Sequence, residues 1–157
     1  MIYLAIFIYA LAIVLANLSV AMFGPSVTPI NAFVLIGLDL ALRNWLSLRM
    51  TKTAMAAMIV GTGALSYTIN PASGMIAIAS GVAFTFAAFT DWMVFNTVAG
   101  HWLKRNFAGN SAGALVDSIV FPTLAFGALM PTIVAAQFIA KVAGGTVWGW
   151  VINRGTK

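Results

Sequence analysis

The sequence of 157 residues contains no cysteine and no glutamate, and it has one histidine and three acidic residues in all. Without cysteine there can be no disulfide bond, thiolate nucleophile or cysteine-type metal site. The one histidine, His101, lies beside Lys104 and Arg105, where we expect a solvated loop residue. No glycine-rich phosphate loop, histidine–glutamate metal motif or nucleophile elbow is present. We therefore expect no enzymatic activity, no catalytic residues, no metal site and no cofactor.

Charged residues of both signs are scarce, at 7% of the chain, whereas hydrophobic residues make up 62%. A soluble globular domain is about 25% charged and roughly 45–50% apolar. So few charges could not cover the surface of a water-soluble fold, so lipid must surround most of the side chains. A closed β-barrel would alternate apolar and polar residues over strands of about ten residues. The apolar runs here are long and continuous, which predicts an all-α membrane protein.

Six apolar segments follow one another along the chain, and each is close to the ~20 residues that a helix needs to cross ~30 Å of hydrocarbon. Breaks at Gly24-Pro25, Asn70-Pro71 and Met130-Pro131, the basic connection at 49–52 and a polar stretch at 101–110 separate them. The first segment lacks the basic n-region of a signal peptide, so it is kept as a span. We expect a single integral membrane domain over residues 1–157. The predicted spans are 2–23, 29–48, 53–69, 74–99, 111–129 and 132–152.

The basic residues outside the spans are confined to alternate connections and the tail. The first, third and fifth loops carry no Lys or Arg. Short loops rich in Lys and Arg stay in the cytoplasm, so we expect both termini there. The net charge of +5 does not point to nucleic acid, because these residues follow helix ends instead of lining one groove. The residues concerned are Arg49 and Lys52, Lys104 and Arg105, and Arg154 and Lys157.

All three acidic residues, Asp39, Asp91 and Asp117, fall inside predicted spans, as do Arg43 and Lys141. An ionised side chain at the centre of a bilayer costs at least ~2.5–3.5 kcal/mol on insertion scales. Five such side chains would be hard to accommodate against lipid. We therefore expect them to face inward, to pair with one another and to border a cavity filled by water or a ligand.

Helical spacing supports an inward-facing polar site. Asp39 and Arg43 are four residues apart on the second span, as are Gln137 and Lys141 on the sixth, so each pair can meet on one face. The alternative is that these residues are structural ion pairs that hold the bundle together. That alternative leaves one of Asp91 and Asp117 without a donor, because Lys141 is the one intramembrane cation left to them, and a ligand could supply the missing donor. Two more stripes share a helical face: Phe84 with Asp91 and Phe95, and Asn110 with Asp117 and Phe121.

Five stretches in order, which together cover nearly the whole chain, form a wider pattern. They are Asn17-Leu18, the segment from Thr28 through Leu38-Asp39-Leu40-Ala41-Leu42-Arg43, Ile78-Ala79-Ser80 through Thr90-Asp91 and Phe95-Asn96, Ser111 with Asp117 and Ala125-Phe126, and Gln137 with Lys141. In this pattern the sequence resembles the queuosine-precursor transporters, also called the vitamin uptake transporter family. The fold of that family is similar to that of the substrate-binding S components of ECF transporters. The sequence departs from it at Asn44-Trp45, where the family usually has Phe-Gly, and in its short loops and tail.

The resemblance implies a transport domain of six transmembrane helices, S-component-like, in the bacterial cytoplasmic (inner) membrane. Its implied substrate is 7-cyano-7-deazaguanine or a related deazapurine. A carboxylate, Asp91 or Asp117, would accept hydrogen bonds from the purine-like edge. Gln137 and Lys141 would fix the orientation of the ring, which would stack on aromatic residues. The implied substrate-binding set is Asn17, Asp39, Arg43, Phe84, Asp91, Phe95, Asp117, Gln137 and Lys141.

Other functions are compatible with the same residues. The chain could be an S component for a different vitamin, which would need separate energising subunits, or a non-transporting assembly or holin-like membrane protein. A non-transporting protein would show no saturable uptake and would tolerate Asp-to-Asn changes. An intramembrane enzyme that uses an aspartate pair is a more remote alternative, since neither Asp91 nor Asp117 lies in a motif for that chemistry. Because the sequence holds no ATP site, facilitated diffusion, ion coupling and a borrowed ATPase all stay open, as does homo-oligomerisation.

Overall fold

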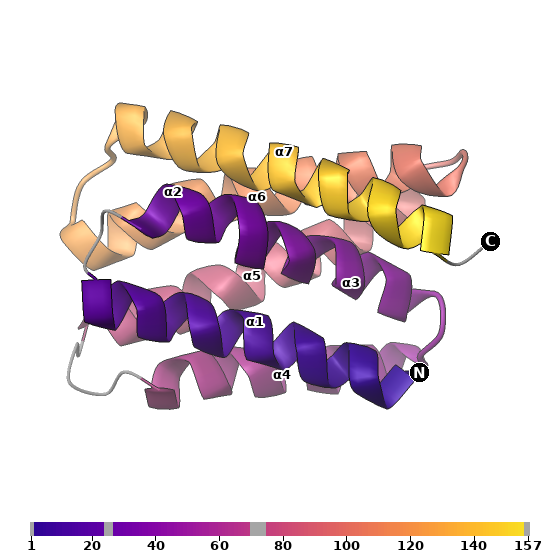
Figure 1. Cartoon of the computed structure of the whole chain (residues 1–157). Coiled ribbons are helices and arrows are strands. Elements are labelled where there is room, and N and C mark those ends of the chain that lie inside the picture. Colours follow the sequence, from indigo (N-terminus) through magenta and orange to yellow (C-terminus); the bar gives the residue numbers. More distant parts are fainter. Residues whose placement is uncertain (1, 24–26, 70–74, 156–157) are drawn as a thin grey trace.

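A computed structural model describes residues 2–23, 27–69 and 75–155, and within these ranges all regular structure is helical (Figure 1). The prediction of an all-α fold is therefore confirmed for the described residues. The elements are α1 (Ile2–Phe23), α2 (Thr28–Asn31), the π-helical segment η2 (Ala32–Ile36), α3 (Gly37–Ser47), α4 (Lys52–Ile69), α5 (Met75–Thr97), α6 (Trp102–Phe126) and α7 (Pro131–Gly155).

The first half of the chain contains one long helix that changes its hydrogen-bond pattern midway. Asn31 and Gly37 flank η2 and both have right-handed helical backbone angles, so α2, η2 and α3 are continuous. This helix corresponds to the single span predicted at 29–48. A short π-helical insertion of this kind widens the helix locally and is often found at functional sites.

The polar stretch at 101–110 is not a loop, so that part of the prediction is wrong. His101 caps the helix, and its Nδ1 accepts a hydrogen bond from the backbone N–H of Lys104 at 3.3 Å. α6 then begins at Trp102 and continues through the whole stretch. The reason lies in the tertiary structure, because Asn106 and Asn110 are buried and their side chains hydrogen-bond inside the protein.

The long helices form a closed ring. α1 packs against α4, α4 against α5, α5 against α6, α6 against α7, α7 against the α2–α3 helix, and that helix against α1. Figure 1 shows them running lengthwise beside one another. Apolar side chains fill two buried clusters, one around Tyr9 and Leu46 between α1 and α3, and one around Met55, Ile59 and Ala88 between α4 and α5.

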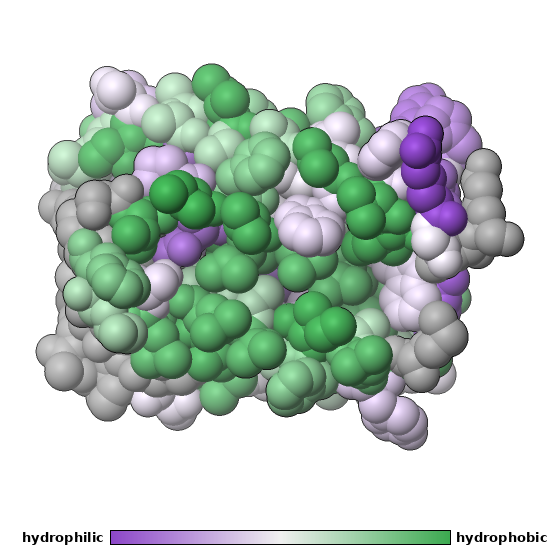
Figure 2. Space-filling view, in the orientation of Figure 1, coloured by the Kyte–Doolittle hydropathy of each residue, from purple (hydrophilic) through white to green (hydrophobic). Residues whose placement is uncertain are grey.

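The outside of the ring is apolar. Figure 2 shows a side of the bundle covered mainly by hydrophobic residues, and large side chains such as Phe7, Phe86 and Ile139 are more than 60% exposed. Among the described residues, one helical stretch, Ile78–Thr97, is by itself long and apolar enough to cross a membrane, and the apolar stretches Ile2–Ala16 and Lys52–Leu65 are shorter. The topology of six spans stays a prediction.

One end of the bundle collects the basic residues. The start of α1, the end of α7, the α3–α4 turn and the α5–α6 turn all lie at this end (Figure 1). Arg49 lies in the α3–α4 turn, Lys52 begins α4, Lys104 and Arg105 are in the first turn of α6, and Arg154 is in the last turn of α7. The basic residues, which lie in alternate connections along the sequence, are therefore gathered at one end of the bundle.

The α2–α3 helix and α7 approach each other closely at glycine. A Cβ atom added to Gly37 would lie 2.7 Å from the Cα of Gly144, and one added to Gly144 would lie 2.7 Å from the backbone carbon of Phe33. Backbone atoms cannot rotate out of the way as a side chain can. These two glycines therefore set the distance between the two helices.

We expect Gly144→Ala to destabilise the bundle by about 1–3 kcal/mol, because the new methyl group would push two helix backbones apart. The matched control is Gly61→Ala on α4, where a Cβ has no neighbour within 4 Å and where alanine is the better helix former. Thermal unfolding of the purified variants in one detergent compares the two. Equal loss of stability in both would contradict the close-packing explanation.

Candidate functional site

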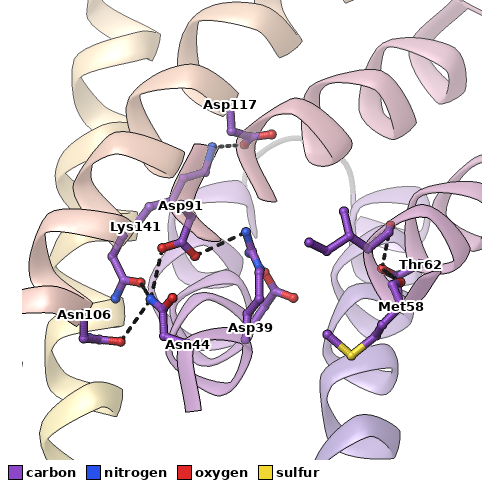
Figure 3. A network of polar contacts seen from close by, with 11 residues as sticks. Asp39, Asn44, Met58, Thr62, Asp91, Asn106, Asp117 and Lys141 are labelled. Carbon is purple, nitrogen blue, oxygen red and sulfur yellow. Dashed lines mark hydrogen bonds and ion pairs between the residues drawn. The ribbon is translucent and has the colours of Figure 1, made fainter. Parts of the chain in front are cut away.

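All three aspartates point into the interior of the ring, as the cost of charge in lipid predicts (Figure 3). Asp39 on α3 and Asp91 on α5 are almost completely buried, with side-chain exposures of 1% and 0%. Asp117 on α6 keeps 25% of its side chain exposed. Among the described residues, the interior cations are Arg43 on α3 and Lys141 on α7, and both are buried.

Arg43 is shared by two carboxylates. Its Nη2 donates to Oδ2 of Asp39 at 2.5 Å, which is the pairing along one helix face that the spacing predicted. Its Nη1 lies 3.3 Å from Oδ2 of Asp91 across the bundle. The guanidinium also lies over the ring of Phe84, 5.6 Å from its centroid. One arginine thus links α3 to α5 and faces two acids.

Lys141 forms the second polar group. Its Nζ donates to Oδ2 of Asp117 at 2.5 Å and to Oε1 of Gln137 at 2.9 Å. The hydroxyl oxygen of Ser118 lies 3.4 Å from the same nitrogen. Gln137 and Lys141 meet on one face of α7, as their spacing predicted, and Asp117 completes the group from α6.

The expectation that one of Asp91 and Asp117 would lack a donor is wrong for Asp117, whereas Asp91 keeps one oxygen, Oδ2, that accepts no hydrogen bond. Lys141 pairs with Asp117, and Asp91 is held by Arg43 and by Asn44, whose Nδ2 donates to Oδ1 of Asp91 at 3.0 Å. The expectation assigns Arg43 to Asp39 alone, whereas Arg43 also lies beside Asp91. Asn44 is a departure from the family pattern and is not among the predicted site residues. An amide in the middle of a predicted span is itself a signal, since polar side chains there usually bond to another helix.

Asn44 is the centre of a buried amide cluster. Its Nδ2 also donates to Oδ1 of Asn110 at 2.9 Å and faces Oδ1 of Asn106 at 3.3 Å. Asn106 in turn donates to the backbone carbonyl of Gly145 at 3.2 Å. The cluster therefore joins α3, α6 and α7, and Asp91 adds α5 (Figure 3).

A cavity of about 140 Å³ lies between the two charged groups. A single water needs roughly 10–15 Å³ of such space, so this cavity could hold a small molecule. Its wall contains both polar groups, the rings of Phe84 and Phe121, and small or apolar residues. The lining residues are Ile13, Ala16, Asn31, Ala32, Ile36, Asp39, Leu40, Arg43, Ser80, Phe84, Ala87, Gly113, Ala114, Asp117, Phe121, Gln137 and Lys141.

The structure brings six of the nine predicted site residues to this cavity. Asp91 lies outside the lining, on the far side of Arg43 from Asp39. Phe95 also lies outside it, with its ring 6.5 Å from that of Trp102 and under the guanidinium of Arg105. Asn17 belongs to α1, but its side chain is outside the part of the chain that the structure describes. The six that line the cavity are Asp39, Arg43, Phe84, Asp117, Gln137 and Lys141.

Asn31 is a lining residue that the sequence did not single out. It is buried at the α2–η2 junction, and its Nδ2 donates to Oγ of Ser19 at 2.7 Å and to the carbonyl of Ala16 at 3.3 Å. It ties α1 to the α2–α3 helix beside the cavity. Its position in a predicted span was again the available signal.

Comparison with known proteins identifies one family. The sequence model of the family described as "Putative vitamin uptake transporter" matches residues 2–153. No curated protein and no solved structure gives a significant match to the chain. The matched range includes every residue of the two charged groups and of the amide cluster.

We expect Lys141→Met to destabilise the protein by about 3 kcal/mol, because it leaves Asp117 facing the interior without its cation. The double variant Asp117→Asn/Lys141→Met removes both charges and should recover most of this loss. Lys104→Met, on the exposed first turn of α6, should change stability by less than ~0.5 kcal/mol. Unfolding free energies measured in detergent test the pairing, which is refuted if the double variant is no more stable than Lys141→Met.

Proposed function

We propose, from the premise that this chain belongs to the vitamin uptake transporter family, that it carries a queuosine precursor across the cytoplasmic membrane. The substrate is 7-cyano-7-deazaguanine or a related deazapurine. The observation that supports this substrate is that Asp117, Gln137 and Lys141 lie together in a cavity that aromatic rings also line. Family membership itself makes the chain a membrane transporter.

The polar wall of the cavity suits the edge of a guanine-like ring. Such an edge presents adjacent N–H donors, and a carboxylate can accept two of them at once. One oxygen of Asp117 bonds to Lys141, and the other points away from it (Figure 3). Lys141 also holds the carbonyl oxygen of Gln137, which leaves the NH₂ group of Gln137 to donate to a carbonyl or nitrile.

The remaining wall suits the faces of a flat heterocycle. Phe84 on α5 and Phe121 on α6 both line the cavity, together with Ala87 and Ala114. Stacking of a base on an aromatic side chain is worth roughly 1–3 kcal/mol. The site therefore combines apolar faces with a polar edge, as small-molecule sites usually do.

The proposed transporter crosses the membrane six times with both termini in the cytoplasm. The even number of long helices brings the start of α1 and the end of α7 to the same end of the bundle (Figure 1). That end carries the basic residues, which favours a cytoplasmic location for it. The apolar sides of the bundle are the surface that lipid would cover (Figure 2).

We expect Asp117→Asn to weaken binding of 7-cyano-7-deazaguanine by about 10–150-fold, because a charge-assisted hydrogen bond is worth ~1.5–3 kcal/mol. Gln137→Ala should weaken it less. Asn96→Ala, exposed on α5 away from the cavity, serves as the control and should bind as the parent does. Equilibrium binding to purified protein in detergent gives the comparison. If the Asp117→Asn variant is folded and binds like the parent, the assignment of Asp117 is wrong.

The absence of cysteine makes the topology directly testable, because an introduced cysteine would be the only thiol. Ala99→Cys lies in the α5–α6 turn and Ala128→Cys in the α6–α7 turn, and both positions are exposed. In intact cells, a membrane-impermeant maleimide should label Ala128→Cys and should leave Ala99→Cys unlabelled until the cells are opened. The reverse pattern would invert the orientation, and labelling of both from outside would contradict the six-span arrangement.

A further inference from the structure

The interior of the bundle carries one negative charge more than its cations can balance. All three acids of the sequence lie in the described residues and face the interior, opposite Arg43 and Lys141. Lys141 balances Asp117, so the excess belongs to the group in which Asp39 and Asp91 share Arg43. The two pairings are unequal. Nη2 of Arg43 lies 2.5 Å from Oδ2 of Asp39, whereas its Nη1 lies 3.3 Å from Oδ2 of Asp91. Asp91, fully buried and the more weakly paired, is where the uncompensated charge falls.

The amide cluster is short of one hydrogen at the same place. The NH₂ group of Asn44 has two hydrogens, but three oxygens face it: Oδ1 of Asp91 at 3.0 Å, of Asn110 at 2.9 Å and of Asn106 at 3.3 Å. Turning the Asn44 amide over does not help, because its own oxygen would then face the other oxygens. Asn106 cannot turn without losing its bond to the carbonyl of Gly145. Turning Asn110 instead would set its NH₂ group, which has no partner in the structure, against the NH₂ group of Asn44. One acceptor around Asn44 is therefore left without a hydrogen.

A single proton on Asp91 removes both deficits, and we infer that Asp91 is a proton-binding site that is occupied at neutral pH in the empty carrier. The protonated carboxyl is neutral, and because it carries its own hydrogen, the two hydrogens of Asn44 are left for the oxygens of Asn106 and Asn110. Two separate observations support the inference: the interior has one negative charge too many, and the oxygens around Asn44 have one hydrogen too few. Both concern Asp91, which is fully buried.

Among the described residues, the one other acid near Asp91 is Asp39, and Asp39 lies closer to Arg43 than Asp91 does. On α3, Asp91 faces Arg43, Asn44 and, beyond the arginine, Asp39. On α6 it packs against Gly109 and Gly113, beside the amides of Asn106 and Asn110. α4 also packs on α5, and its one charged residue, Lys52, is at its exposed first position.

Arg43 connects the proton site to the cavity. Asp39 lines the cavity and Asp91 does not, and Arg43 lies between them. A ligand group that donates hydrogen bonds to Asp39 weakens the hold of Asp39 on Arg43. Arg43 can then pair fully with Asp91, whose O–H bond breaks and releases the proton to water. Ligand binding and proton binding at Asp91 are therefore antagonistic, and by linkage ligand affinity rises with pH.

Infrared spectroscopy of the protein in lipid tests the proton site without any ligand. At neutral pH the parent should show the carbonyl stretch of a protonated carboxylic acid, which Asp91→Asn should lack. Asp39→Asn should lack it too, because Arg43 is then free to pair with Asp91 alone. Asp117→Asn is the matched control and should keep the band, since its acid has its own cation.

Each result bears on the inference. Absence of the band in the parent, or its survival in Asp91→Asn, overturns the proton site. If Asp91→Asn does not fold, Asp39→Asn decides, and a band that persists in that folded variant contradicts the sharing of Arg43. If the role of Asp91 were purely structural and did not depend on Arg43, the band would remain in Asp39→Asn.

The link to the cavity rests on the proposed function and has its own experiment. Binding of 7-cyano-7-deazaguanine should tighten as pH rises in the parent and should be independent of pH in Asp91→Asn. A parent affinity that is independent of pH, or that falls as pH rises, overturns the link. No binding at any pH, with the infrared band present, would count against the proposed substrate and leave the proton site established, so the two failures are distinguishable.

Discussion

The structure depends on one physical constraint, which is that hydrocarbon does not solvate charged side chains. Five ionisable side chains inside apolar helices must find their partners within the ring, and the contacts they make join most of its members. Arg43 connects α3 to α5, Lys141 connects α7 to α6, and the amides around Asn44 connect α3, α6 and α7. The same constraint that makes these groups costly to bury also makes their arrangement specific, because a partner that moves away leaves a charge unpaired.

The two charged groups have different relations to the cavity. The group of Asp117, Gln137 and Lys141 borders it entirely, so each of its members can reach a ligand. The group around Arg43 borders it through Asp39 and Arg43 and continues behind the wall to Asp91 and the amide cluster. A substrate in the cavity could therefore contact both groups directly and would influence Asp91 through Arg43. Packing at Gly37 and Gly144 brings α7 close enough to the α2–α3 helix for both groups to share one cavity.

Much of the site could be read from the order of residues. Spacing by four residues predicted both same-helix pairs, because such positions share a face on any helix. The polar stretch at 101–110 was misassigned for the converse reason. Its composition is that of a loop, and what makes it helical is the burial of Asn106 and Asn110 against α3 and α7, which local sequence does not encode. The sequence predicts that Asp91 or Asp117 contacts the substrate, because one cation is left for both, but the partners of Asp91 come from another helix.

The sequence alone determined the class of the protein, because the shortage of charge forces lipid contact and because alternating basic loops are a property of the chain order. It also determined which residues are too costly to face lipid. Only the tertiary structure decided which of them line the cavity and which stand behind it. The distance between two helices depends on how closely their backbones can pack. Which side chains pair across helices depends on how each helix is rotated about its own axis, and the spacing of residues along one helix does not specify that rotation.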